Sequence, residues 1–355
     1  MTHRFSAPPA SRTSVRGPVK ALAAAAAAAS LLLTGCVAGE DSGAAANANG
    51  AAGGTLTLDF ATYNPLSLII KDQGWLETAL AEDGVTVEWV QSAGSNKANE
   101  NLRSGAVDVG STAGSAALLN RANGSPIKVI DVFSQPEWSA LVVGADSDIA
   151  SVSDLKGKSV AATKGTDPYF FLVQALDEAG LSLKDVTVEQ LQHADGRTAL
   201  ENGSVDAWAG LDPIMAGAEQ NGARLIYRNL DFNTYGLLAA NESFLEEDPE
   251  QAQAVVDAYE KARAWAAENP EETARILADV AGLDPAVAQT VVLERSNLDV
   301  DPAPGDAQRS VLAKIGSTLV ETGDVASQDA VDKALDGLLE NSFVRNAAPA
   351  ATKDS

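Results

Sequence analysis

The chain has very little of the chemistry on which many enzymes depend. Its 355 residues include one cysteine and two histidines, His3 and His193. A single cysteine cannot form a disulfide within the chain, and a single histidine beyond the N-terminal segment cannot build a histidine cluster for zinc. The sequence also has no GxxxxGK[ST] phosphate loop and no GxSxG turn. These absences disfavour zinc, cysteine and serine hydrolases and phosphate-loop enzymes.

Positive charge is scarce as well. The chain has 25 Lys and Arg against 49 Asp and Glu, which gives a formal net charge of −24. Such a surface repels nucleic acid and anionic lipid, so we expect neither as a partner. Aromatic residues make up only 5% of the chain, but 45% of it is hydrophobic. A chain of this length and composition is large enough for two lobes, each with its own core.

The longest apolar stretch lies near the N-terminus. Residues 21–33 follow a basic segment and are too few to span a bilayer comfortably. The next residues include LTGC, which ends at the only cysteine, Cys36, and resembles a bacterial lipobox. We therefore expect a lipoprotein signal peptide over residues 1–35 and a lipid anchor on Cys36 at the extracytoplasmic face of the cell membrane. The small, polar residues 36–54 are typical of a flexible tether.

Beyond residue 54 the hydrophobic pattern alternates between strands and helices. Strand-like runs such as TLTLDFA and VTVEWV are followed by helices that begin at Pro or end at Gly. A second set of such units contains GSVDAWAG, which is similar to SGAVDVGS in the first set. After residue 240 the pattern is almost wholly helical. We predict two α/β lobes, each a mostly parallel sheet flanked by helices.

Small and polar residues follow four of the predicted strands, at positions 62–65, 110–113, 164–167 and 209–212. In open parallel sheets, ligands bind beyond the carboxyl ends of the strands. Backbone N–H groups at the start of the next helix can also reach a small polar ligand there. Any one of these segments is typical of an ordinary helix N-cap. Their recurrence is what predicts a ligand site.

Several longer segments resemble a known family. They include LRSGAVDVGSTAGSAAL, SVSDLKGKSVAATKGTDPYFFLVQALDEAG and ENGSVDAWAGLDPIMAGAEQNGARLI. Over residues 64–341 the chain is similar to the aliphatic-sulfonate, taurine and nitrate group of ABC-importer substrate-binding proteins. The resemblance implies a two-lobed, type II periplasmic-binding-protein fold. Lobe 1 would comprise residues 55–143 and 235–343, with the C-terminal helices packed on it, lobe 2 residues 144–234, and a disordered tail residues 344–355.

The resemblance also implies a role. The protein would be a monomeric binding protein without cofactor or metal, and not an enzyme. It would capture a sulfonate or taurine-like ligand by hinge closure and deliver it to an ABC permease and its ATPase subunits. Two other uses of the fold stay open, a biosynthetic enzyme of the thiamine-pyrimidine type and a sensor subunit that presents its ligand to a receptor. His193 and Asp195 have no third member of a catalytic triad, and we expect His193 at the surface.

Carried over position by position, the resemblance implies ten ligand-binding residues. They are Tyr63, Asn64, Ser111, Thr112, Trp138, Gly165, Thr166, Asp167, Asp212 and Tyr235. Hydroxyl and amide donors with helix N-termini suit the oxygens of a sulfonate, and the aromatic rings suit an apolar tail. The chain departs from the family pattern at Asp167-Pro168, where a Ser, a Thr or a small residue is usual. Asp167 therefore either caps its own helix or binds the ammonium group of a ligand.

Overall fold

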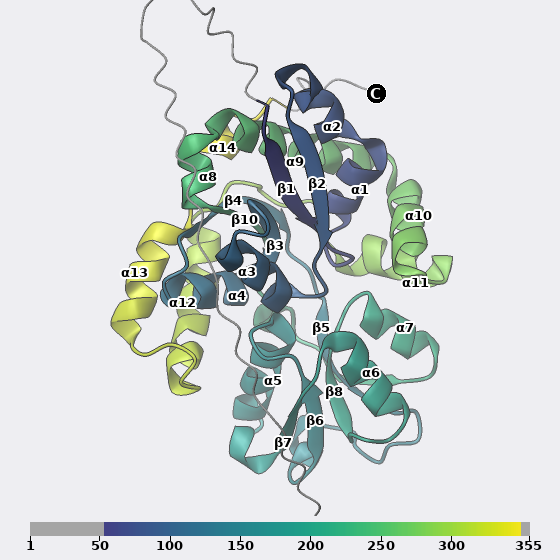
Figure 1. Ribbon diagram of the computed structural model, residues 1–355. Helices are drawn as coiled ribbons and strands as arrows, with labels where there is room; N and C mark the ends of the chain where they lie inside the picture. Colours follow the sequence, from purple (N-terminus) through teal and green to yellow (C-terminus); the bar gives the residue numbers. More distant parts are fainter. Residues whose placement is uncertain (1–52, 349–355) are drawn as a thin grey trace, which may run out of the picture. The chain divides into compact units, whose positions relative to one another are not determined.

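The computed structural model describes residues 53–348, so the predicted signal peptide, Cys36 and most of the predicted tether lie outside the described residues. The described part contains two five-stranded sheets, with strand orders β2-β1-β3-β10-β4 and β7-β6-β8-β5-β9 (Figure 1). Their strands are β1 (Thr55–Phe60), β2 (Thr86–Gln91), β3 (Val109–Ala113), β4 (Ile127–Ser134), β5 (Ser139–Val143), β6 (Ser159–Ala162), β7 (Thr187–Gln190), β8 (Ala207–Leu211), β9 (Arg224–Tyr227) and β10 (Gly236–Asn241).

Helices follow most strands and then form the C-terminal third of the chain. The α-helices are α1 (Pro65–Gln73), α2 (Trp75–Leu80), α3 (Ser95–Ser104), α4 (Gly114–Ala122), α5 (Asp167–Glu178), α6 (His193–Glu201), α7 (Ile214–Gln220), α8 (Glu242–Glu247), α9 (Pro249–Glu268), α10 (Pro270–Ala281), α11 (Pro285–Gln289), α12 (Asp306–Glu321), α13 (Gln328–Leu338) and α14 (Ser342–Arg345). Short helices of other types are η1 (Ala81–Asp83), η2 (Val152–Leu155), η3 (Leu183–Asp185), η4 (Leu230–Phe232) and the π-helical η5 (Thr290–Arg295).

The chain crosses between the two sheets twice. It leaves the first sheet after β4 and returns to it as β10, which lies antiparallel between β3 and β4. In the second sheet β5 lies antiparallel between β8 and β9, and the pairs β6–β7 and β6–β8 are parallel. We call the first sheet with its helices lobe 1 and the second sheet with its helices lobe 2. This arrangement confirms the predicted two-lobed α/β fold.

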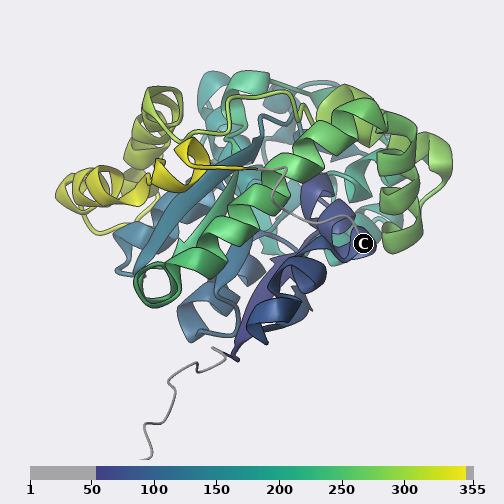
Figure 2. The same ribbon diagram turned by 90° about the horizontal axis from the view of Figure 1, so that it is seen from above.

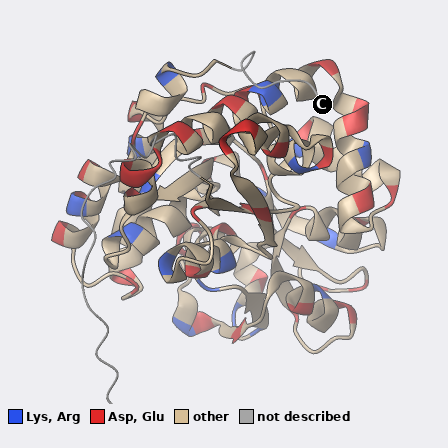
Figure 3. Cartoon of the chain, turned by 45° about the horizontal axis from the view of Figure 1, so that its top comes forward, with Lys and Arg blue, Asp and Glu red and all other residues tan. Residues whose placement is uncertain are grey.

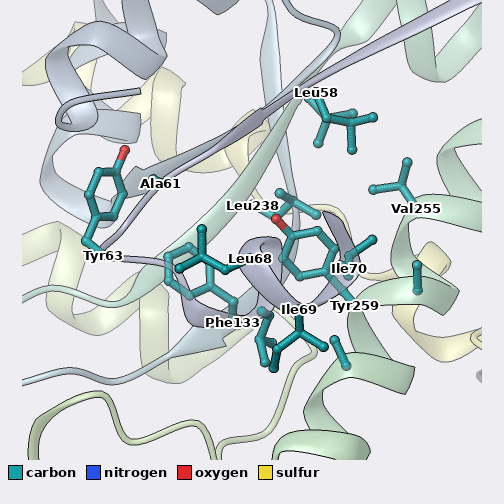
Figure 4. Close-up of a cluster of buried hydrophobic side chains, with 14 of the residues drawn as sticks. Leu58, Ala61, Tyr63, Leu68, Ile69, Ile70, Phe133, Leu238, Val255 and Tyr259 are labelled. Atoms are coloured by element: carbon teal, nitrogen blue, oxygen red, sulfur yellow. The ribbon is translucent and has the colours of Figure 1, made fainter. Parts of the chain in front are cut away.

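Buried apolar side chains cover both faces of each sheet. One cluster joins β1 to α1 and α9, and Figure 4 shows Leu58, Ile70 and Tyr259 within it. Seen from above, the long helix α9 crosses beside the strands of lobe 1 (Figure 2). A second cluster includes residues of α4, α5 and α12, and so joins the two lobes. A third lies between the second sheet and the helices α6 and α7.

Two parts of the chain differ from the sequence prediction. The apolar pattern of residues 65–80 predicts one helix that begins at Pro65, but the structure divides it into α1 and α2 at Gly74, whose φ of +62° lies in the left-handed region that favours glycine. The predicted tail begins too early, because α14 continues to Arg345 and the Ala348 N–H donates to Asp257. Acidic residues are spread over many helices, with basic residues between them (Figure 3). Among residues 53–348 no helix combines the length and the apolar character needed to cross a membrane.

Candidate functional site

Residues 62–65, which follow the first strand, belong to a buried hydrogen-bond network and not to an open polar surface. Asn64 is the N-cap of α1, and its Nδ2 donates to Ser111 Oγ at 2.8 Å and to Tyr259 Oη at 3.0 Å. The Tyr63 hydroxyl donates to the Ser111 carbonyl at 2.9 Å. Ser111 Oγ in turn donates to Asp59 Oδ1 at 2.8 Å, and the Ser111 N–H donates to the same oxygen at 2.7 Å. The network therefore fixes the end of β3 against the end of β1.

Asp59 lies beneath this network and was not predicted. It is 1% exposed, and burial raises the pKa of its carboxyl to about 7, although hydrogen bonds from serine side chains and from the Ser111 N–H oppose the shift. The available signal was a single carboxylate inside the strand TLTLDFA. An aspartate in a central strand needs hydrogen-bond partners because it is buried.

Trp138 and Tyr63 form the aromatic wall of a small cavity. Trp138 lies in the segment between β4 and β5, and the two ring centroids are 5.9 Å apart in an edge-to-face arrangement. The cavity has a volume of about 10 Å³ and is lined by Tyr63, Pro136, Trp138, Asp212, Val291, Arg295 and Ser296. Residues of both lobes and of the first crossover thus meet at one point. The cavity as it stands has room for about one water molecule.

Arg295 provides the positive charge of this cavity. It lies at the end of η5, is 6% exposed, and its Nη1 is 3.3 and 3.4 Å from the two carboxylate oxygens of Asp212, which follows β8 in lobe 2. Its Nη2 contacts Glu219 at 2.6 Å. Burial raises the pKa of Asp212 to about 6, against the opposing effect of Arg295. Arg295 was missed because it ends an apolar helical segment without any motif.

The carboxylate of Asp167 is fully enclosed. The N-cap of α5 is Thr166, and Asp167 is the first helical residue. The Asp167 carboxylate accepts hydrogen bonds from Ser115, Trp138 and Thr234, none of which belongs to α5. The helix-cap alternative for Asp167 is therefore wrong, since its side chain bonds to the opposite lobe and to both crossover segments.

The other predicted residues lie around this centre without lining the cavity. Thr112 Oγ1 is 3.3 Å from Asn99 Oδ1, and Thr166 Oγ1 donates to the Thr163 carbonyl at 2.6 Å. Gly165 has φ +80° and closes the turn before α5. Tyr235 is partly exposed and packs on the cluster that joins the lobes. Of the ten predicted residues, Tyr63, Trp138 and Asp212 line the cavity.

His193 lies in the lobe boundary, not at the surface as expected. It is 1% exposed, and its Nδ1 is 3.3 Å from Thr163 Oγ1. The Thr163 hydroxyl donates to the Leu191 carbonyl, so Nδ1 must carry the imidazole hydrogen. Nε2 has no hydrogen-bond partner and lies 3.1 Å from the place that a Cβ on Gly94 of lobe 1 would take. Burial lowers the pKa of His193 to about 4.

Two α/β lobes with a cavity between them are the arrangement of the periplasmic-binding-protein fold. Residues 69–273 match the family model described as NMT1/THI5 like. The chain belongs to the NMT1/THI5-like family. It is 30% identical, over 293 residues, to the putative aliphatic sulfonates-binding protein of Bacillus subtilis (strain 168), a match that covers 81% of this chain and 85% of that relative.

Solved structures agree on the fold. The alkanesulfonate-binding protein SsuA from Xanthomonas axonopodis pv. citri, bound to MOPS, superimposes with a TM-score of 0.71 at 24% identity, covering 79% of this chain and 97% of that one. The desulfurization enzyme DSZB superimposes with a TM-score of 0.61 at 15% identity, covering 82% of this chain and 98% of that one. The same fold therefore occurs in binding proteins and in an enzyme, and fold alone does not decide between them.

Proposed function

We propose that the protein is the extracytoplasmic substrate-binding protein of an ABC importer, with an aliphatic sulfonate or a taurine-like compound as its ligand. The observation that carries this proposal is the cavity lined by Tyr63, Trp138, Asp212 and Arg295, because both lobes and a crossover segment contribute to it. Sulfonate-binding relatives that match most of the chain support the choice of ligand.

The residues of the cavity suit the two ends of such a ligand. An edge-to-face aromatic pair offers an apolar surface to a short alkyl chain. The Arg295 guanidinium can exchange a carboxylate partner for sulfonate oxygens, and Asp212 can then accept a ligand ammonium group. Around Tyr63, Trp138 and Asp212, the other proposed ligand-binding residues are Asn64, Ser111, Thr112, Gly165, Thr166 and Tyr235.

Binding would work by hinge closure. The cavity of about 10 Å³ is smaller than any alkanesulfonate, so the lobes must separate at the two crossover segments for a ligand to enter. The ligand then favours the closed form by its higher affinity for it. The closed protein would deliver the ligand to a membrane permease and its ATPase subunits. We further propose that a lipid on Cys36 holds a monomer at the extracytoplasmic face of the membrane.

Isothermal titration calorimetry on the full-length chain tests the ligand. We expect saturable binding of ethanesulfonate or taurine, and none of ethylammonium chloride, which has no sulfonate group. Tyr63→Ala should weaken binding by about tenfold, or about 1.4 kcal/mol, because it removes one of the two aromatic surfaces that face the alkyl chain. A folded chain that gives no saturable heat with either sulfonate would refute the proposed ligand class.

A further inference from the structure

The Asp167 carboxylate is bound as an anionic ligand would be. Its Oδ1 accepts from Ser115 Oγ at 2.5 Å and from Thr234 Oγ1 at 2.6 Å. Its Oδ2 accepts from the Thr234 N–H at 2.8 Å and from Trp138 Nε1 at 2.9 Å. Each oxygen therefore has two donors. Asp167, Ser115, Trp138 and Thr234 are all at most 3% exposed, so water does not compete for these bonds.

The four donor groups belong to three residues that lie outside α5. Ser115 is the second residue of α4 in lobe 1, Trp138 lies in the first crossover, and Thr234 lies in the second. The positive end of the α4 dipole adds to their effect on a negative charge. The four groups that donate to the carboxylate are uncharged, so it is held by directed hydrogen bonds and not by an ion pair.

The set of donors adjoins the proposed ligand cavity. Trp138 donates to Asp167 through its indole N–H while its ring lines the cavity beside Tyr63. An oxyanion in the cavity could therefore reach the same donors if the carboxylate were removed. With Asp167 present, two like charges would share one set of donors in a buried site, which is strongly unfavourable.

We propose that the four donors around Asp167 form an oxyanion-binding site that the chain fills with its own carboxylate. Asp167 is then a specificity-determining residue, because it keeps the anionic group of a cleft ligand out of this site and directs it toward Arg295. The oxyanion site needs no ligand other than Asp167 itself. The specificity role rests on the proposed function, since it requires an anionic ligand in the cleft.

Chemical rescue of Asp167→Ala tests the site. The substitution leaves a space the size of a carboxylate, which formate fits. We expect the melting temperature of the full-length variant to fall, and formate well above its dissociation constant to restore about 2 °C more than an equal concentration of sodium chloride. The wild type should respond equally to the two salts. Rescue needs no cleft ligand, so its outcome does not depend on whether the protein binds sulfonates.

Matched variants separate a site from simple loss of structure. Asp167→Asn fills the space, and its amide can place the oxygen toward the two N–H donors and the N–H₂ toward the two hydroxyls, so we expect no rescue by formate. Asp185→Gly removes an exposed carboxylate that accepts from Ser182 on the surface, and formate should not rescue it either. If Asp167→Ala does not fold, Asp167→Ser provides the same test with a smaller change. Equal responses of the Ala or Ser variant to formate and chloride would overturn the proposal.

Ligand affinity tests the specificity role. We expect Asp167→Ala to bind ethanesulfonate about tenfold more tightly than the wild type, because the vacated donors can then accept its oxygens. Weaker binding by this variant would overturn the specificity role and would assign Asp167 to the ligand itself. Rescue by formate would still establish the oxyanion site in that case.

Discussion

At the scale of single residues, the candidate site is dominated by buried carboxylates. Asp59, Asp167 and Asp212 are each at most 3% exposed, and burial raises the pKa of each. Asp59 and Asp167 have neutral hydrogen-bond donors, whereas Asp212 has a guanidinium. The three groups therefore respond differently to pH and to substitution, although all lie close to the lobe boundary.

Asp59 should make the folded protein less stable as the pH rises, which is opposite to the effect of most carboxylates. Its pKa is about 7 in the folded protein and about 3.9 in an unfolded chain. The folded state therefore binds the extra proton between these values, and its stability falls as the pH rises through 7. We expect Asp59 to cost about 4 kcal/mol of unfolding free energy at pH 8 relative to pH 4.

Urea unfolding of the wild type and of Asp59→Asn at a series of pH values measures this. The amide imitates the protonated carboxyl, so the variant should gain stability over the wild type as the pH rises from 5 to 8. The difference between the two proteins cancels the contribution of the surface carboxylates. A difference that stays constant across this range would show that Asp59 does not titrate there.

At the scale of elements, the sequence predicted the architecture well and the site less well. Alternating strands and glycine-closed helices were readable because the hydrophobic period changes with the type of element. Arg295 could not be assigned, since its position beside Asp212 depends on how η5 meets the turn after β8, far apart in the chain. The role of Asp167 depends likewise on Ser115 and Thr234, which no local pattern connects to it.

The N-termini of α3 and α6 give a prediction at this scale. Gly94 precedes α3, and a Cβ there would lie 2.9 Å from Asn96 Oδ1 and 3.1 Å from Nε2 and Cδ2 of the buried His193 ring at the start of α6. Its φ of 170° suits any residue, so the glycine is required by space alone. We expect Gly94→Ala to destabilise the protein by about 1 to 3 kcal/mol through overpacking of the lobe boundary.

A double-mutant cycle with His193→Ala checks this cause. Removal of the imidazole makes room for the new methyl group, so Gly94→Ala should cost much less in the His193→Ala background. The measurement is the unfolding free energy of the four proteins in urea. Additive costs would mean that the methyl group introduced at position 94 does not clash with the His193 ring.

At the scale of the whole described molecule, the proposed closure would depend on which ion pairs cross the lobe boundary. Arg295 and Asp212 form one that does, because η5 packs with lobe 1 and Asp212 follows β8 in lobe 2. Arg263 and Asp131 form a similar buried pair within lobe 1, between α9 and β4, at the same N–O distance of 3.3 Å. Each arginine also contacts a glutamate, and Arg263 donates in addition to three backbone carbonyls. The Arg263 pair lies within one lobe, whereas the Arg295 pair joins two.

Arg295→Met and Arg263→Met should therefore have different effects, although both leave a buried carboxylate without its cation. Within lobe 1 this loss costs about 3 to 5 kcal/mol of unfolding free energy, since Asp131 stays buried whatever the lobes do. Asp212 can regain water when the lobes separate, so we expect Arg295→Met to open the molecule instead. Small-angle X-ray scattering should give a larger radius of gyration for Arg295→Met and an unchanged one for Arg263→Met. If both variants scatter like the wild type, the Arg295–Asp212 pair does not hold the lobes together.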